Sequence, residues 1–229
     1  MLYRNLKSKL FRTIGSLGVA GVVLAGVAAM AFTASSPQAA RAGGEITPPP
    51  LPVDMAPVPK GNKLFLGTHA VGTQNYVCRP SGAGFAYVLF TPEATLFGDD
   101  GGQVITHDFT PNPFEPNTDP KVVANGAIRA TWQHRDTSRV WALAHGTDPD
   151  GRKGVVTPDT SAIAWVLLDK VGVLKGPTGG DTLFKTTFVQ RLNTTGGLAP
   201  TTGCSSLTDV GNFAFVPYTA DYFFYQKAD

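Results

Sequence analysis

From residue 63 onward the sequence consists of short apolar stretches separated by turn residues, and this pattern constrains the fold most. Glycine, proline, asparagine and aspartate interrupt the chain so often that no window of a dozen residues forms a convincing amphipathic helix. The predicted strands are Leu64–Thr68, Gln74–Arg79, Phe85–Thr91, Gln103–Phe109, Ala127–His134, Arg139–Ala144, Ala162–Leu168, Leu183–Leu192, Phe213–Val216 and Tyr222–Tyr225. Of these, only the continuously apolar Ala162–Leu168 is equally compatible with a short helix. The pattern predicts one all-β domain, either an antiparallel β-sandwich or a closed β-barrel, with little helix beyond the N-terminal leader.

The first 42 residues predict an export signal. Basic residues occur between Arg4 and Arg12, no charged residue follows from Thr13 to Ala40, and Ala40-Arg41-Ala42 has small residues at the spacing that a signal peptidase cleaves. We therefore expect residues 1–42 to be a signal peptide and the protein to be secreted, either outside the cell or in the cell envelope. The alternative is a retained anchor, because the neutral stretch is long enough to span a bilayer. After cleavage we expect no membrane span.

Removal of the signal changes the charge balance. The mature part keeps 14 of the 19 basic residues and all 17 acidic ones, so its formal charge is −3 in place of +2. A mildly acidic chain without a cluster of lysine and arginine is not expected to bind nucleic acid. Residues 43–60 contain six prolines, which exclude helix and central strand. We expect this segment to be an extended linker or an arm along the edge of a single β-rich domain, residues 61–229.

Cys78 and Cys204 are the only cysteines of the chain. Two thiols that reach an oxidising compartment most often form one disulfide. A metal site would need more ligands at short spacing, and a catalytic thiol would leave the second cysteine unexplained. We therefore expect a structural disulfide and predict neither a bound metal nor a cofactor.

Two tryptophans in the segment Ala127–Ala144 give the strongest candidate for a binding surface. The predicted strands flank Asp136-Thr137, and a two-residue turn there would place Trp132 directly opposite Trp141. Such a pair could form an aromatic platform that stacks on a sugar ring. The alternative is that both indoles belong to the core, as large aromatic side chains usually do.

Polar side chains would border this platform. The same two-residue turn pairs His134 with Arg139, and His107 on the preceding strand is a further candidate ligand-binding residue. These residues favour a non-catalytic binding or structural domain of the cell envelope, with a polysaccharide or another cell-wall polymer as its partner.

A secreted hydrolase or metal-dependent enzyme is the alternative function. The side chains available for acid–base or nucleophilic chemistry are His107, His134, Asp136 and Ser138. However, the chain has no HExxH zinc motif, no GxSxG nucleophile elbow, no P-loop and no dinucleotide fingerprint. The sequence therefore favours binding over catalysis.

Several segments together resemble one secreted family of bacteria and fungi. They are Pro59–Phe65, Gly72–Cys78, Trp132 with Asp136 and Ser138, Phe188–Gly197, Gly203-Cys204 and Val216–Tyr225. This pattern is similar to the family catalogued as domain of unknown function 3455, from about Pro59 to the C-terminus. The resemblance implies a single exported β-rich domain and a Cys78–Cys204 pairing, and it implies no activity.

The chain departs from the family pattern at one place. Members typically have a His-aromatic-x-Gly-Pro stretch before the tryptophan, whereas here His107-Asp108-Phe109 continues into Thr110-Pro111. The residues from Asn112 to Asn125 look like an insertion. A shared role for His107 therefore does not follow from the resemblance.

Overall fold

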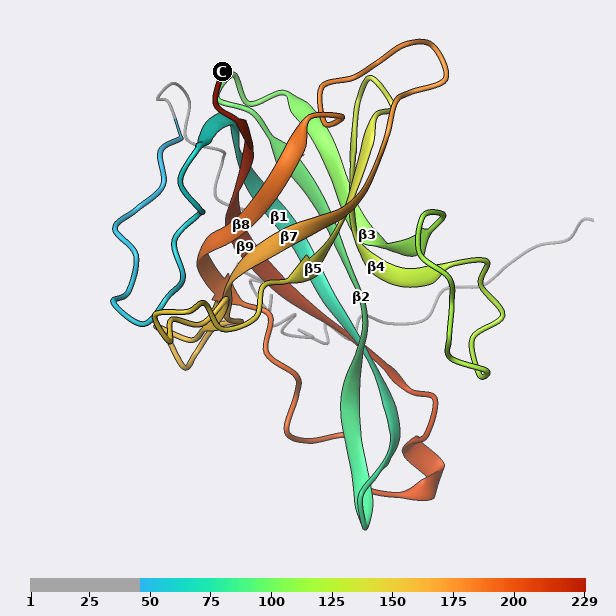
Figure 1. Cartoon of the computed structure of the whole chain (residues 1–229). Helices are drawn as coiled ribbons and strands as arrows, with labels where there is room; N and C mark the ends of the chain where they lie inside the picture. Colours follow the sequence, from blue (N-terminus) through green and yellow to red (C-terminus); the bar gives the residue numbers. More distant parts are fainter. Residues whose placement is uncertain (1–45) are drawn as a thin grey trace, which may run out of the picture. The chain divides into compact units, whose positions relative to one another are not determined.

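The computed structural model describes residues 46–229, which form an eight-stranded antiparallel barrel (Figure 1). The strands are β1 (Asn62–Ser81), β2 (Gly84–Phe97), β3 (Gln103–Asn112), β4 (Ala127–His134), β5 (Arg139–Ala144), β6 (Val155–Val156), β7 (Trp165–Leu174), β8 (Thr186–Gly196) and β9 (Phe213–Lys227). Each strand from β1 to β5 pairs with the next, as do β7 to β9. The pairs β5–β7 and β9–β1 close the ring, and β6 adds to β7 outside it. The predicted all-β class is confirmed, and of the two predicted architectures the structure has the closed barrel. The predicted signal peptide, residues 1–42, lies outside the described residues.

Long strands replace several of the short predicted ones. β1 runs through both Leu64–Thr68 and Gln74–Arg79, and β9 runs through both predicted C-terminal strands. The β4 and β5 bounds are the predicted ones. The single helical element in residues 46–229 is the 3₁₀ turn Leu207–Asp209, and no helix in this part of the chain is long and apolar enough to cross a membrane.

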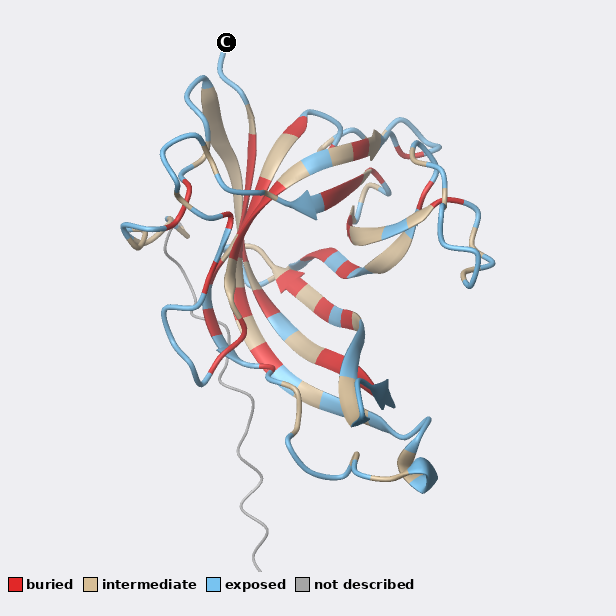
Figure 2. Cartoon of the chain, turned by 60° about the horizontal axis from the view of Figure 1, so that its bottom comes forward, coloured by how far each residue is buried: buried red, intermediate tan, exposed pale blue. Residues whose placement is uncertain are grey.

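Buried residues are distributed along the strands of the barrel (Figure 2), and they form one cluster on each side of its wall. Inward-facing residues such as Leu96, Trp132 and Phe224 form the interior core. Outside the wall, the proline-rich segment covers Leu167, Leu192, Phe223 and other residues of β7, β8 and β9. Its Met55 and Ala56 are almost fully buried, and Met55 forms a parallel bridge with Lys153. Residues 46–60 therefore lie against the barrel as part of its core packing.

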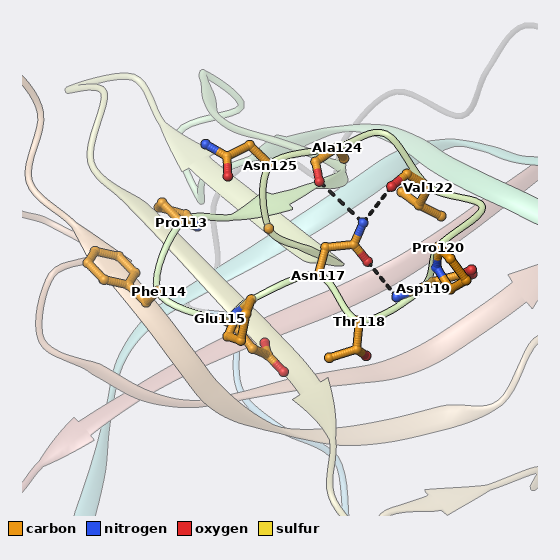
Figure 3. A pocket seen from close by; sticks show the side chains of 12 residues that line it. Pro113, Phe114, Glu115, Asn117, Thr118, Asp119, Pro120, Val122, Ala124 and Asn125 are labelled. Carbon is orange, nitrogen blue, oxygen red and sulfur yellow. Dashed lines mark hydrogen bonds between the residues drawn. The ribbon is translucent and has the colours of Figure 1, made fainter.

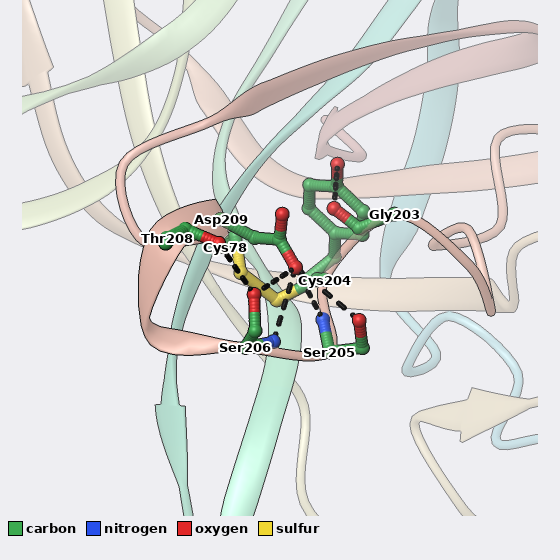
Figure 4. Close-up of a disulfide and its surroundings, with 8 residues drawn as sticks. Cys78, Gly203, Cys204, Ser205, Ser206, Thr208 and Asp209 are labelled. Atoms are coloured by element: carbon green, nitrogen blue, oxygen red, sulfur yellow. Dashed lines mark hydrogen bonds between the residues drawn. A yellow bond between two sulfur atoms is a disulfide. The ribbon is translucent and has the colours of Figure 1, made fainter.

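The β1–β2 hairpin extends beyond the barrel and is fixed there by the disulfide (Figures 1 and 4). Cys78 of β1 is bonded to Cys204 in the β8–β9 connection, with the two Cα atoms 5.5 Å apart. Next to Cys204, the Asp209 carboxylate accepts hydrogen bonds from the Ser205 and Ser206 backbone amides. The predicted disulfide is confirmed, and the bond links segments 126 residues apart in the sequence.

The predicted pairing of the two tryptophans is wrong by one residue. The β4–β5 turn contains three residues, Arg135 to Thr137, because the His134 amide donates to the Ser138 carbonyl oxygen and Thr137 adopts a φ of 69°. Thr131 is therefore opposite Trp141, and Trp132 is opposite Val140. A shift of one residue moves every side chain of a strand to the other face. The two indoles consequently lie on opposite sides of the barrel wall.

Candidate functional site

A cavity of about 290 Å³ lies inside the barrel. Its wall is mainly apolar and is formed by residues of all eight barrel strands, from Gln74 on β1 to Tyr222 on β9. Leu89, Ile128 and Leu143 border it and are exposed, so the cavity opens to solvent on their side, near the start of β4. An eight-stranded barrel is just wide enough to enclose one small ligand, and this volume lies at the small end of the range for such sites.

The inner part of the cavity is built on a stack of two aromatic rings. The imidazole of His107 on β3 lies parallel to the indole of Trp132 on β4, with ring centroids 4.4 Å apart and an interplanar angle of 3°. The two residues are direct cross-strand partners, which explains why their rings meet. Tyr222 of β9 packs edge-on against both rings, at centroid distances of 5.3 Å and 5.7 Å. All three side chains are almost fully buried.

His107 is held as a neutral imidazole. Burial lowers its pKa to about 3, and the nearby guanidinium of Arg191 also lowers it. His107 Nδ1 lies 2.8 Å from the carbonyl oxygen of Thr131. Because a carbonyl oxygen only accepts hydrogen bonds, Nδ1 carries the proton and Nε2 keeps its lone pair. His107 therefore brings one hydrogen-bond acceptor, and no positive charge, to the cavity at neutral pH.

Two buried donors that line this cavity have no acceptor. Within residues 46–229, Trp132 Nε1 has no hydrogen-bond partner, and Gln74 Nε2 has only the Tyr218 hydroxyl nearby, outside normal hydrogen-bond geometry, although Trp132 is 1% exposed and Gln74 is 2% exposed. The great majority of buried polar groups in proteins are hydrogen-bonded, so an unpaired one needs an explanation such as an ordered water or a ligand. These two residues therefore mark the part of the barrel interior where a water or a ligand could supply a hydrogen-bond acceptor.

Arg191 of β8 is the one guanidinium of the cavity wall that lacks an acidic partner. Its Nε and Nη2 atoms donate to the Ala164 carbonyl oxygen, at 3.1 Å and 2.9 Å, and within residues 46–229 no carboxylate lies within 4 Å of it. Arg129 also lines the cavity, but it forms a salt bridge with Glu115. Arg191 is half-buried, so its charge is partly removed from water without being compensated.

The predicted binding residues are divided between two sides of the barrel wall. His107 and Trp132 come together in the cavity. Trp141 lies on the outer side, where its Nε1 donates to Thr110 Oγ1 at 2.9 Å and its ring contacts Phe114 of the β3–β4 loop. Arg139, also outside, donates to the side chain of Gln133. The pairing of His134 with Arg139 is wrong for the same reason as that of the tryptophans, since Arg139 is opposite Gln133.

The residues considered for hydrolysis do not form one site. His134, Asp136 and Ser138 lie at the end of the barrel away from the cavity mouth, where β4 turns into β5. We call this the closed end. His107 lies in the cavity. Ser138 Oγ donates to Asp136 Oδ1 at 2.6 Å and accepts from the Leu183 amide at 3.0 Å. Ser138 is fully buried, and no histidine contacts its hydroxyl. A serine held in this way is a structural hydrogen-bonding group.

Asp136 is the centre of this closed-end network. Its Oδ2 accepts from the Thr182 amide at 3.0 Å and from the Thr182 hydroxyl at 2.7 Å, and His134 Nδ1 lies 3.0 Å from its Oδ1. Burial acts to raise the pKa of Asp136, but the hydrogen bonds from Ser138 and Thr182 outweigh it and hold this pKa below its usual value. Gly180 approaches so closely that a Cβ there would lie 2.0 Å from the Asp136 carbonyl oxygen. The network joins the β4–β5 turn to the β7–β8 loop.

A second hollow, of about 750 Å³, is formed by the β3–β4 loop alone (Figure 3). Asn117 holds this loop together, because its Nδ2 donates to the carbonyl oxygens of Val122 and Ala124 and its Oδ1 accepts from the Asp119 amide. The loop corresponds to the stretch, residues 112–125, that looked like an insertion. Its polar groups satisfy one another, and within residues 46–229 no three His, Cys, Asp or Glu side chains are arranged to hold a metal ion.

Comparison with protein-family models shows to which family the chain belongs. A family model described as "Protein of unknown function (DUF3455)" matches residues 59–226, which is most of the sequence. The chain belongs to this family. A search of curated proteins and a search of solved structures found no match.

Sequence reasoning missed most residues of the cavity in this DUF3455 protein, among them the polar residues Gln74, Arg191 and Tyr222. Arg191 follows Gln190, and the structure places the two on opposite sides of the wall, with Arg191 opposite the inward-facing Tyr222. Gln190 lies on the outer side and accepts a hydrogen bond from the Tyr225 hydroxyl at 2.7 Å. Two adjacent polar residues do not reveal which one faces inward, so the alternation of this strand gave no usable signal.

Proposed function

We propose that this protein is a non-catalytic binding domain that holds a small molecule inside its barrel. The observation that supports the proposal is the cavity itself, which opens at one end and is lined by two buried donors, Trp132 Nε1 and Gln74 Nε2, that have no acceptor at normal geometry within residues 46–229. A ligand atom in this place would supply the missing acceptor, and the apolar wall would gain from the removal of water.

A small molecule fits better than the polymer expected from the sequence. A polysaccharide that stacks on aromatic rings needs an exposed platform, but Trp132 is 1% exposed and Trp141 is 2% exposed. The cavity volume of about 290 Å³ admits only a small group. We therefore assign binding to the barrel interior and do not retain the two-tryptophan platform.

The proposal is tested by blocking the mouth of the cavity. Ala144 lines the cavity at an exposed position, so Ala144→Trp should fill the opening without disturbing the core. Ala83, at the exposed tip of the β1–β2 hairpin, provides the matched control Ala83→Trp. Calorimetric titrations would use octanoate, cinnamate and their primary amides as probes.

We expect at least one probe to bind the unmodified protein and the Ala83→Trp variant, and Ala144→Trp to weaken its binding at least tenfold. A cooperative thermal unfolding transition in each variant would establish that both are folded. Absence of binding by all four probes, or equal binding by the two variants, would refute the proposal.

We further propose that the protein is exported and works in the cell envelope or outside the cell. The support is the sequence of the first 42 residues and the disulfide, because disulfides persist in oxidising compartments. Cells that express the full chain should release a protein that begins at Gly43 and has no free thiol. A cytoplasmic protein with Met1 retained and both thiols reduced would contradict this proposal.

A further inference from the structure

We infer that the ligand of the barrel is a small carboxylic acid with an apolar body, bound with its carboxylate beside Arg191. This inference rests on the proposed function and adds the chemical class of the ligand. Its basis is the uncompensated charge of Arg191 together with the unpaired donors of Trp132 and Gln74.

The ionisable groups that sense the charge of Arg191 within residues 46–229 are neutral. The ionisable groups whose pKa responds to its charge are His107 and three tyrosines: Tyr76, Tyr218 and Tyr222. Burial keeps His107 uncharged, and burial raises the pKa of each tyrosine, so all four are neutral at pH 7. A half-buried cation with only neutral neighbours favours a ligand that carries negative charge.

Two of the other polar groups are donors that favour an acceptor on the ligand, whereas His107 Nε2 is itself an acceptor. Trp132 Nε1 is a donor only, and the amide nitrogen of Gln74 is likewise a donor. Arg191 uses Nε and Nη2 for a single carbonyl oxygen and also hydrogen-bonds the neutral Tyr222 hydroxyl, so within residues 46–229 none of its donors reaches an anion. A carboxylate, which only accepts hydrogen bonds, matches these donors.

The apolar cavity wall indicates that the ligand, apart from its carboxylate, has an apolar body. Apart from its polar side chains, which also include His107, Arg129 and Tyr222, the cavity is lined by apolar side chains such as Phe109, Val166 and Leu168. One unpaired guanidinium matches a single negative charge, whereas a doubly charged phosphate would leave charge uncompensated in this apolar surrounding. Octanoate and cinnamate are suitable probes because each joins one carboxylate to an apolar body.

The test compares each acid with its own primary amide, which has nearly the same shape and no charge. Calorimetric titration of the full chain at pH 7 measures both. We expect the acid to bind at least tenfold more tightly than the amide. In Arg191→Met, which keeps the length of the side chain and removes its charge, this preference should fall below threefold. Arg191→Lys should retain part of it.

Arg139→Met is the matched control, because Arg139 lies on the outer side of the wall and should leave the preference unchanged. Equal affinity of acid and amide, both abolished by Ala144→Trp, would overturn the carboxylate inference and leave the binding function intact. A preference for the acid that persists in Arg191→Met would also overturn it. Failure of all four probes to bind would instead refute the binding function itself.

Discussion

The closed end of the barrel and the interior cavity both bury polar side chains, but only at the closed end do these side chains satisfy one another. Asp136 accepts hydrogen bonds there from Ser138 and Thr182. In the cavity, the described part of the chain offers no acceptor to Trp132 Nε1 and no acidic partner to Arg191. A complete network stabilises the fold, whereas an incomplete one needs a further molecule to complete it. Substitutions at the closed end should therefore change stability, and substitutions in the cavity should change binding.

Loss of the disulfide should have the largest effect on stability and almost none on binding. In the chain-entropy model, a loop closed over a separation of 126 residues is worth roughly 4–5 kcal/mol, and measured values are often smaller. The double substitution Cys78→Ala and Cys204→Ala should lower the free energy of unfolding by an amount approaching this in urea titrations. Because the bond lies on the projecting hairpin, affinity for octanoate should stay within twofold of the unmodified value. A large loss of affinity in the folded variant would show that the two regions are coupled.

Asp136→Asn should lower stability without changing ligand binding, because Asp136 lies at the closed end and not in the cavity. It removes the charge that accepts from Ser138 and Thr182 and turns an amide nitrogen towards at least one of these donors. Hydrogen bonds to charged groups contribute about 1.5–3 kcal/mol each, so we expect a loss of about 2–4 kcal/mol in urea titrations. Binding of octanoate by the folded protein should be unchanged. A variant of normal stability would remove the structural role assigned to Asp136.

His107 should make stability depend on pH. Its pKa is about 3 in the folded protein and 6.5 in the unfolded chain, so between these values only the unfolded chain takes up the proton. The contribution of His107 is therefore complete above pH 6.5 and is lost as the pH falls towards 3. Between pH 6.5 and 4.5 this amounts to about 2–3 kcal/mol.

The variant His107→Asn keeps a donor for the Thr131 carbonyl oxygen and cannot titrate. Urea titrations between pH 6.5 and 4.5 should give it a smaller loss of stability than the unmodified protein, each compared with its own value at pH 6.5. Equal losses would mean that His107 is protonated in the folded state over this range.

Arg191→Met should change stability little. It removes a half-buried charge, which favours folding, and it also removes the donors to the Ala164 carbonyl oxygen, which opposes folding. We expect the free energy of unfolding to change by less than about 1 kcal/mol. A loss of several kcal/mol would place Arg191 with the closed-end residues as a structural group.

The smallest effect is expected at Arg129. This residue also lines the cavity, but its charge is already compensated by Glu115. Arg129→Gln should therefore change the affinity for octanoate by less than threefold in calorimetric titrations. A loss as large as that in Arg191→Met would show that any cation near the mouth attracts the ligand, and that the lack of an acidic partner at Arg191 is irrelevant.

The sequence predicted the all-β class and the positions of most strands, because turn residues separate the strands, although it divided the long strands β1 and β9. The predicted bounds of β4 and β5 agree with the structure, and the Cys78–Cys204 pairing is confirmed. It did not predict which side of the wall each residue faces around the β4–β5 turn. Thr137 with a positive φ added one residue to that turn, and this single residue separated Trp132 from Trp141.

Of the cavity, only His107 and Trp132 were among the residues predicted to bind a ligand, and the rest was missed for a related reason. Its residues come from strands far apart in the chain, from Gln74 on β1 to Tyr222 on β9, and only the closure of the ring brings them together. Polar residues are also buried on the outer side, where Gln190 is opposite Phe223, a residue that the proline-rich segment covers. Hydrophobic alternation alone therefore does not distinguish the interior of this barrel from its exterior.

The most direct test of the ligand site is the indole N–H resonance of Trp132, followed by NMR as octanoate is added. Trp141 is an internal control, because its Nε1 already donates to Thr110 on the outer side of the wall. We predict that the Trp132 resonance shifts progressively until the site is saturated while that of Trp141 stays in place. If binding saturates and the Trp132 resonance does not move, the ligand does not occupy the interior of the barrel and the account is wrong.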